Sequence, residues 1–330
     1  MRSNENSNVS FEDNQKEPLI VVAGPTAVGK SDLALFLAKH LDGAVLSADS
    51  MQVYRGMDIG TAKVREEERR GIPHYLIDIL SPEEEWNVMR FLTEAKKAYG
   101  MIREQGQLPI LCGGTGFYVD AFVRDVDFTE EETDPLYRES LYQEAAGDVL
   151  SLYRKLQQTD PDYAKEIHPN NVKRIVRALE YHHLTGQTLS FHNRTQKEKT
   201  SPYKVFYLVL TDERKTLYER IDRRVDAMME EGLLAEVISL KEQYPSLTDV
   251  SRLSVSMQGI GYKELLLYLD GQLSLQEAVD LIKQNTRHFA KRQLTWFKKS
   301  PGAVFFSLEE ERDRDRFYES ILEKIKEYYQ

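Results

Sequence analysis

The segment at residues 24–31, which reads GPTAVGKS, most constrains how this chain of 330 residues can fold. It matches the pattern G-x-x-x-x-G-K-[ST], and the apolar residues 19–22 before it predict a short buried strand. Its glycines let a turn approach a phosphate closely, while backbone N–H groups and the following helix N-terminus hold the anion. The residues expected to bind phosphate are Gly24, Pro25, Thr26, Ala27, Val28, Gly29, Lys30 and Ser31. The Ser31 hydroxyl is also a candidate ligand for Mg²⁺.

The composition is that of an ordinary globular protein, with 41% hydrophobic and 30% charged residues. One cysteine, Cys112, excludes a disulfide framework and a multi-cysteine zinc site, and it favours a reducing, cytoplasmic location. No apolar run reaches the length of a bilayer span, and the N-terminus lacks the apolar core of a signal peptide. We therefore expect no membrane association and a disordered N-terminal arm at residues 1–16.

Strand-like and helical patterns alternate along the first part of the chain. Strands are predicted at residues 19–23, 44–47, 109–112 and 205–210, with helical patterns separating the first three. This alternation predicts an α/β fold, with a P-loop core of three layers around a parallel sheet. Residues 125–199 show helical patterns and no clear strand, which predicts an all-helical insertion domain. The core then comprises residues 17–124 and 200–330, with one long helical segment at 214–243 and helices continuing to the C-terminus.

Charge is distributed unevenly over a chain whose net charge is −10. Residues 125–150 contain nine acidic side chains and one basic one, Arg138, whereas residues 165–199 contain seven basic and three acidic ones. Residues 283–300 contain six basic and no acidic side chains. Such patches on an acidic protein indicate a polyanion bound at one defined place, although ordinary solvated helix faces explain them equally well.

Two polar residues follow predicted strands, where open α/β sheets bind their substrates. Asp49 comes just after the second strand, as a base that accepts a proton from a nucleophile or as a cap of the next turn. Thr115 follows the third strand within a glycine-rich turn, as a contact to substrate or metal. A tight turn with positive φ would explain the glycines but not the threonine.

Three groups of cations are candidate anion contacts. Arg220, Arg223 and Arg224 follow the last predicted strand, where P-loop kinases carry arginines that clamp phosphates. Lys173, Arg174 and Arg177 lie in the insertion, and the two arginines share a helical face. Arg287, Lys291 and Arg292 are interleaved with Phe289 and Trp296, a combination that suits unstacked RNA bases.

These motifs together resemble the tRNA dimethylallyltransferase family, also called tRNA isopentenyltransferases. The resemblance rests on six segments in this order: "GPTAVGKS", "SADSMQVYRGMDIGTAK", "GGTGFY", "HPNNVKRIVRALE", "QGIGYKE" and "AKRQLTWF". It covers residues 18–297, and the long block around Asp49 is its most specific part. With one cysteine the chain lacks the C-terminal zinc finger of larger eukaryotic relatives, so it resembles the shorter bacterial form.

The resemblance implies transfer of a dimethylallyl group from dimethylallyl diphosphate to the exocyclic N6 amine of the adenosine on the 3′ side of the anticodon. It also implies that the P-loop, with Mg²⁺, holds the diphosphate of the prenyl donor instead of ATP. Asp49 would take the amine proton, Thr115 would contact substrate, and Arg224 matches the family's lid arginine, with Arg223 leaving the register open by one. The target adenosine would be flipped into the protein, which would act as a monomer.

The resemblance and the basic patches together imply a set of contacts to the tRNA anticodon stem-loop. This set comprises Asp49, Ser50, Met51, Gln52, Thr115, Arg138, Lys173, Arg174, Ile175, Val176, Arg177, Gln258, Gly259, Gly261, Tyr262, Lys263, Arg287, Lys291 and Arg292.

Other functions remain open from the sequence. One is isopentenyl transfer to a free adenine nucleotide on the same core, which would leave the basic helical insertion without a purpose. Another is an ATP-dependent P-loop kinase; a GTPase is disfavoured because the chain has no N-K-x-D motif. A non-catalytic tRNA-binding module would leave the P-loop and Asp49 unexplained.

Overall fold

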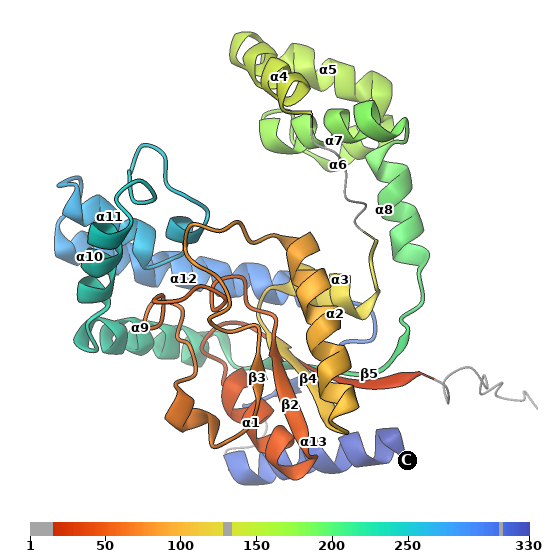
Figure 1. Cartoon of the computed structure of the whole chain (residues 1–330), viewed down its shortest axis with the longest axis vertical. Coiled ribbons are helices and arrows are strands. Elements are labelled where there is room, and N and C mark those ends of the chain that lie inside the picture. The colour runs from red at the N-terminus through yellow and green to blue at the C-terminus, as the bar shows by residue number, and fades with distance from the viewer. Residues whose placement is uncertain (1–15, 128–133, 310–312) are drawn as a thin grey trace, which may run out of the picture. The chain divides into compact units, whose positions relative to one another are not determined.

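A computed structural model of the chain describes residues 16–127, 134–309 and 313–330 (Figure 1). The chain divides into two compact units. The first combines Met1–Val123 with Pro202–Gln330, and the second is Arg124–Ser201. The expected N-terminal arm falls almost entirely on residues 1–15, which lie outside the described residues. No helix in the described ranges is long and apolar enough to cross a membrane.

The first unit is built on a sheet of six parallel strands in the order β3-β2-β4-β1-β5-β6. The strands are β1 (Glu17–Ala23), β2 (Gly43–Ser47), β3 (His74–Tyr75), β4 (Leu108–Gly113), β5 (Tyr203–Thr211) and β6 (Val304–Ser307). β1 lies between β4 and β5 and is buried from Leu19 to Ala23, as its continuous apolar run predicts. The strands that carry the P-loop, Asp49 and Thr115 therefore all end at one edge of the sheet.

Helices cover both faces of this sheet, which confirms the predicted α/β fold class (Figure 1). Ile20 and Val22 of β1 pack into one core with residues of α1 (Lys30–His40) and α13 (Arg314–Tyr329). Because side chains alternate along a strand, Leu19 and Val21 point to the opposite face. There α2 (Val88–Glu104) and α3 (Gly116–Val123) contact β4 and form an aromatic cluster through Phe91, Tyr118 and Phe122.

The remaining helices of this unit differ in two ways from the sequence prediction. The expected long helix at 214–243 is two helices, α9 (Arg214–Glu230) and α10 (Leu233–Gln243), because Gly232 takes a φ of +103° between them. Helices do not continue to the C-terminus after α11 (Tyr262–Leu269) and α12 (Leu275–Phe297). Instead, β6 adds an edge strand before α13, and its four residues, none of them fully buried, gave no clear signal in the sequence.

The second unit consists of α4 (Pro135–Gly147), α5 (Val149–Thr159), α6 (Pro161–Glu166), α7 (Val172–Thr185) and α8 (Leu189–Glu198). Its described residues contain no strand. The sequence predicts the insertion at residues 125–199, and the second unit spans Arg124–Ser201. Side chains of Asp134, Asp148, Asp160, Asn171 and Thr188 cap the five helix N-termini. The helices enclose a separate hydrophobic core that includes Leu152, Leu156 and Ile175.

Candidate active site

The phosphate loop connects β1 to α1 and leaves the start of that helix uncapped. Gly24 and Gly29 have φ values of +144° and +100°, and a Cβ on Gly24 would lie 2.6 Å from the Leu210 carbonyl oxygen. No side chain caps the first amides of α1, and the Lys30 Nζ donates to the Pro25 carbonyl at 2.7 Å. The loop therefore offers backbone N–H groups and a fixed ammonium to an anion.

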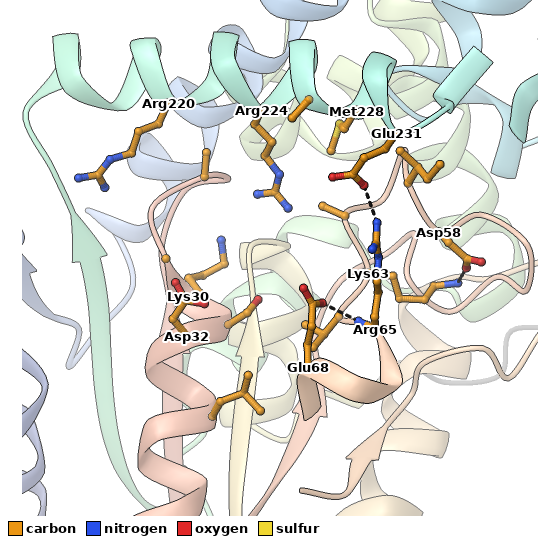
Figure 2. A pocket seen from close by; sticks show the side chains of 18 of the residues that line it. Lys30, Asp32, Asp58, Lys63, Arg65, Glu68, Arg220, Arg224, Met228 and Glu231 are labelled. Carbon is orange, nitrogen blue, oxygen red and sulfur yellow. Dashed lines mark hydrogen bonds and ion pairs between the residues drawn. The ribbon is translucent and has the colours of Figure 1, made fainter. Parts of the chain in front are cut away.

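The first cavity, of about 640 Å³, opens over this loop (Figure 2). Figure 2 shows the Lys30 ammonium and the Arg224 guanidinium pointing into it from α1 and α9. Burial lowers the pKa of Lys30 to about 8 and also lowers the pKa of Arg224, against the opposing effect of the Asp49 carboxylate. Neither cation forms an ion pair with any described carboxylate. Two partly buried cations that no described carboxylate neutralises make this cavity a site for a polyanion.

The structure distinguishes between the three arginines of α9. Arg220 forms an ion pair of 2.9 Å with Asp212, and Arg223 is exposed and donates to the Glu219 carbonyl. Arg224 is the one of the adjacent pair that lines the cavity. The geometry therefore favours Arg224 over Arg223 as the clamp.

The second cavity, of about 430 Å³, shares a wall with the first. Arg224, Ala62 and Met228 line both cavities, whereas Asp49, Thr115 and Thr26 line the second. Its other walls are largely apolar and include Ile221, Val225, Leu233, Ile260, Ile282 and Phe289. A polyanion in the first cavity thus lies next to an apolar space that contains a carboxylate.

Asp49 and Thr115 meet because β2 and β4 are neighbours in the sheet, with Ser47 in register with Cys112. The Oδ1 atom of Asp49 accepts hydrogen bonds from the Met51 N–H at 2.8 Å and the Gln52 N–H at 3.3 Å. The capping interpretation is thus correct for one carboxylate oxygen. Oδ2 has no hydrogen bond to any described residue, so it can accept a substrate proton. The Thr115 hydroxyl accepts from the Ser50 N–H at 3.2 Å, which ties the two turns together.

Close packing explains the glycines around Thr115. Gly113, Gly114 and Gly116 do not have positive φ, so the tight-turn interpretation is wrong. A Cβ on Gly113 would lie 2.4 Å from the Ala48 carbonyl oxygen. One on Gly114 would lie 2.2 Å from Gln293, and one on Gly116 would lie 2.3 Å from Trp296. These glycines allow β2 and α12 to approach the turn.

Gln293 is a site residue that the sequence analysis missed. Its side chain is buried on α12, accepts from the Thr26 N–H at 2.8 Å and donates to the Gly114 carbonyl at 2.9 Å. It thus joins the phosphate loop to the Thr115 turn. The sequence signal for Gln293 was a polar residue on the apolar face of an amphipathic helix. It stands directly after Lys291 and Arg292, which were interpreted as the functional residues of this stretch.

The expected tRNA contacts on α7 divide into two groups. Lys173, Arg174 and Arg177 are exposed, whereas Ile175 and Val176 are completely buried in the core of the second unit. The structure corrects the assignment of these two residues, whose side chains stabilise the helix bundle. Arg138, on α4, is exposed and forms an ion pair of 2.7 Å with the buried carboxylate of Glu180.

Two further expected contacts in the first unit have polar partners within the protein. Tyr262 is 1% exposed and donates to Glu236 at 2.6 Å, and it also lines the second cavity. The guanidinium of Arg287 pairs with Asp222, a partner that the sequence did not reveal.

The other expected contacts in this unit are near the second cavity or exposed. Ser50, Met51, Gln258, Gly259, Gly261 and Arg292 line the second cavity, and Lys263 and Lys291 are exposed. The side chain of Gln52 is occupied by Ser47 and by the carbonyls of Thr61 and Ala62.

The donor set for a metal ion is small. The described residues contain no group of three or more His, Cys, Asp or Glu side chains that could hold a metal ion. Ser31, at the start of α1, lines the first cavity and offers one hydroxyl. One such ligand fits Mg²⁺, which commonly takes one or two protein ligands and completes its shell with phosphate oxygens and water.

Comparisons with known proteins agree with this geometry. The family model described as IPP transferase matches residues 52–300. The chain is 51% identical to the tRNA dimethylallyltransferase of Lachnoclostridium phytofermentans, over 88% of this chain and 92% of the relative. It is 44% identical to the Bacillus subtilis tRNA dimethylallyltransferase, over 90% and 92% of the two chains.

Solved structures give the same result. The full-length tRNA isopentenylpyrophosphate transferase of Bacillus halodurans is similar with a TM-score of 0.72 and 43% identity, over 95% of this chain and 97% of that one. A eukaryotic dimethylallyltransferase acting on tRNA is similar with a TM-score of 0.80 and 31% identity, over 93% and 77%.

Proposed function

The chain belongs to the IPP transferase family as a tRNA dimethylallyltransferase, and from this premise we propose how its two cavities carry out the reaction. The enzyme transfers a dimethylallyl group from dimethylallyl diphosphate to the N6 amine of the adenosine that follows the anticodon, and it releases diphosphate. The observation that carries this proposal is that Arg224 lines both the polyanion cavity and the cavity that contains Asp49.

The donor diphosphate occupies the first cavity, over the phosphate loop. Negative charge builds on the diphosphate as the C–O bond to the prenyl group breaks. The amides at the start of α1, the Lys30 ammonium and the Arg224 guanidinium are placed to stabilise that charge. Mg²⁺, held by the Ser31 hydroxyl and the diphosphate oxygens, would add positive charge at the leaving group.

The acceptor adenine occupies the part of the second cavity next to Asp49, with the prenyl group between it and the diphosphate. The N6 lone pair forms the new C–N bond, and the amine proton passes to Oδ2 of Asp49, which the turn leaves available. Oδ1 stays with the Met51 and Gln52 amides and keeps the carboxylate oriented. Thr115 lines the same cavity, so its hydroxyl would contact the same adenine.

Exposed cations supply the electrostatic attraction for tRNA. Lys173, Arg174 and Arg177 of α7 would contact phosphates of the anticodon stem-loop, and Lys291 and Arg292 of α12 would contact the loop near the second cavity. Both cavities are lined by one chain, so the protein would act as a monomer. It would act on tRNA in the cytoplasm, which its single cysteine also favours.

The test is incubation with labelled dimethylallyl diphosphate and unmodified tRNA, followed by digestion and nucleoside analysis. We expect label in N6-dimethylallyladenosine from tRNA and none on free AMP or ATP. Label on the free nucleotide instead would establish adenylate isopentenyltransferase activity. Transfer of phosphate from ATP, with no prenyl transfer, would establish a kinase.

A further inference from the structure

A segment at residues 58–63 forms a wall of both cavities. Asp58, Ile59 and Lys63 line the first cavity, Gly60 and Thr61 line the second, and Ala62 lines both. The segment belongs to the long connection between β2 and β3 and contains no helix or strand. Its position therefore depends on side chains that reach it from other elements.

One carboxylate, that of Glu236 on α10, holds this wall from outside the cavities. Its Oε2 accepts from the Asp58 N–H at 3.0 Å and the Ile59 N–H at 2.8 Å. Its Oε1 accepts from the Gly60 N–H at 3.2 Å and from the Tyr262 hydroxyl at 2.6 Å. Four donors from two chain segments thus converge on a single charged acceptor, and hydrogen bonds to charged groups are the stronger kind.

The aromatic ring of Tyr262 fits directly against the same segment. A Cβ on Gly60 would lie 2.6 Å from the ring, so only glycine allows this approach. Burial raises the pKa of Tyr262 well above its usual value, and the Glu236 carboxylate raises it further, so the phenol remains a donor. The start of α11 is therefore fixed to the wall through Glu236.

The opposite side of the wall is tied to the Asp49 turn. The Gln52 Nε2 donates to the Thr61 and Ala62 carbonyls at 3.3 and 3.4 Å, and Asp49 holds the Gln52 N–H. The buried Lys63 ammonium donates to the Tyr54 carbonyl and pairs with Asp58 at 2.6 Å. A displacement of the wall would thus reach the turn that carries the proposed base.

We propose that Glu236 is a positioning residue for prenyl transfer: it fixes the wall at 58–63, and so holds the donor diphosphate and the acceptor adenine in register. The inference rests on the proposed use of the two cavities. Glu236 lines neither cavity, so it acts only through the wall. Misplacement of reacting groups by about 1 Å can cost on the order of 10²-fold in rate, so the effect falls on turnover.

Three variants remove different numbers of the hydrogen bonds that Glu236 accepts. Glu236→Ala removes all four hydrogen bonds, Glu236→Gln keeps one carbonyl acceptor, and Tyr262→Phe removes one donor while it keeps the ring. We expect kcat to fall by about 10–100-fold in Glu236→Ala, by a few-fold in Tyr262→Phe, and by an intermediate factor in Glu236→Gln. The KM for tRNA should change less than twofold in each variant. Glu242→Ala, an exposed carboxylate on the same helix, is the matched control and should leave kcat unchanged.

Amide hydrogen exchange separates positioning from general stability. In Glu236→Gln and Tyr262→Phe, we expect faster exchange at 58–60 without faster exchange in β1 or β4. A normal kcat in variants that show this faster exchange would overturn the proposal, as would unchanged exchange at 58–60 in all three variants. If Glu236→Ala does not fold, the other two variants still decide the question. Failure of the wild type to transfer prenyl groups would refute the proposed function, whereas the exchange result would still test whether Glu236 holds the wall.

Discussion

At the scale of single residues, some charged side chains of the site pair with other protein groups, and others remain available to substrates. Asp49 uses one oxygen for its own turn and leaves the other for chemistry. Lys30 and Arg224 are partly buried and have no described carboxylate partner, whereas Lys63 is buried and pairs with Asp58 and Asp78. Partial burial makes an uncompensated positive charge unfavourable, and an anionic substrate would neutralise it.

Asp49→Asn tests the general base with little structural disturbance. The asparagine Oδ1 can still accept from the Met51 and Gln52 amides, so the turn should persist. The variant cannot accept the amine proton, and we expect kcat to fall by about 10² or more with tRNA affinity nearly unchanged. Asp270→Asn, which alters an exposed carboxylate that lines neither cavity, is the control. Near-normal turnover of Asp49→Asn would exclude this role.

Cys112 gives a prediction about pH. Burial raises the pKa of its thiol to about 11, an effect that outweighs the opposing charge of Lys30. Since an ordinary thiol has a pKa of about 8.5, its thiolate fraction at pH 8 is roughly 10²-fold larger than that of Cys112. We expect native protein to react with iodoacetamide slower by about this factor than urea-unfolded protein, with the rate rising towards pH 11. Mass spectrometry reads the result without ambiguity because the chain has one cysteine. Equal rates would mean an accessible thiolate.

At the scale of elements, the site depends on how closely β2 and α12 approach the turn after β4. Gly113→Ala would place a methyl group 2.4 Å from backbone at the end of β2, directly before Asp49. Overpacking of this kind costs about 1–3 kcal/mol. Gly100→Ala is the matched control, because this glycine of α2 has nothing within 4 Å of its added Cβ. We expect Gly100→Ala to raise the free energy of unfolding by about 0.5–1 kcal/mol in denaturant titrations. Equal effects of the two substitutions would contradict the packing argument.

Helix α7 tests how an acidic protein binds tRNA. The double substitution Arg174→Ala and Arg177→Ala removes two exposed cations without touching the buried face of the helix. We expect weaker tRNA binding, and a slope of log affinity against log salt that shrinks by roughly one to two units. Arg154→Ala on α5 is the control for loss of an exposed charge in the same unit. An unchanged slope in a folded double variant would make α7 an ordinary solvated face.

At the scale of the whole molecule, the first cavity collects residues that are far apart in the chain. Lys30, Lys63, Arg224 and Arg314 all line it. A ligand that contacts these segments together stabilises the folded first unit over the unfolded chain.

Thermal protection therefore tests the identity of the ligand. Dimethylallyl diphosphate at 100 times its Kd should stabilise the protein by about 2.7 kcal/mol, which a melting experiment detects. ATP at the same concentration should give little protection, and Lys30→Ala should reduce the protection by the prenyl donor. Stronger protection by ATP would favour a kinase and count against our placement of the prenyl diphosphate.

The sequence by itself determined the class of fold and indicated which residues are candidates for the chemistry. A buried apolar run followed by GPTAVGKS defines a strand, a phosphate loop and a helix, because each step depends on local conformation. The polar residues after β2 and β4 were found for a similar reason, since strand ends in a parallel sheet share one edge. The break at Gly232 and the short strand β6 depend on weaker local signals and were missed.

Only the tertiary structure decided which cations are available and which residues support the site. Arg138 and Arg287 form ion pairs with carboxylates that folding brings close to them. Arg224 lines a cavity instead. Gln293 and Glu236 act on segments more than 170 residues away in the chain. Hydrogen bonds over such separations depend on the packing of whole elements, and no local pattern encodes them. The spacing of residues predicted the class of chemistry and its candidate residues, whereas long-range packing determined which of those side chains remain available to a substrate.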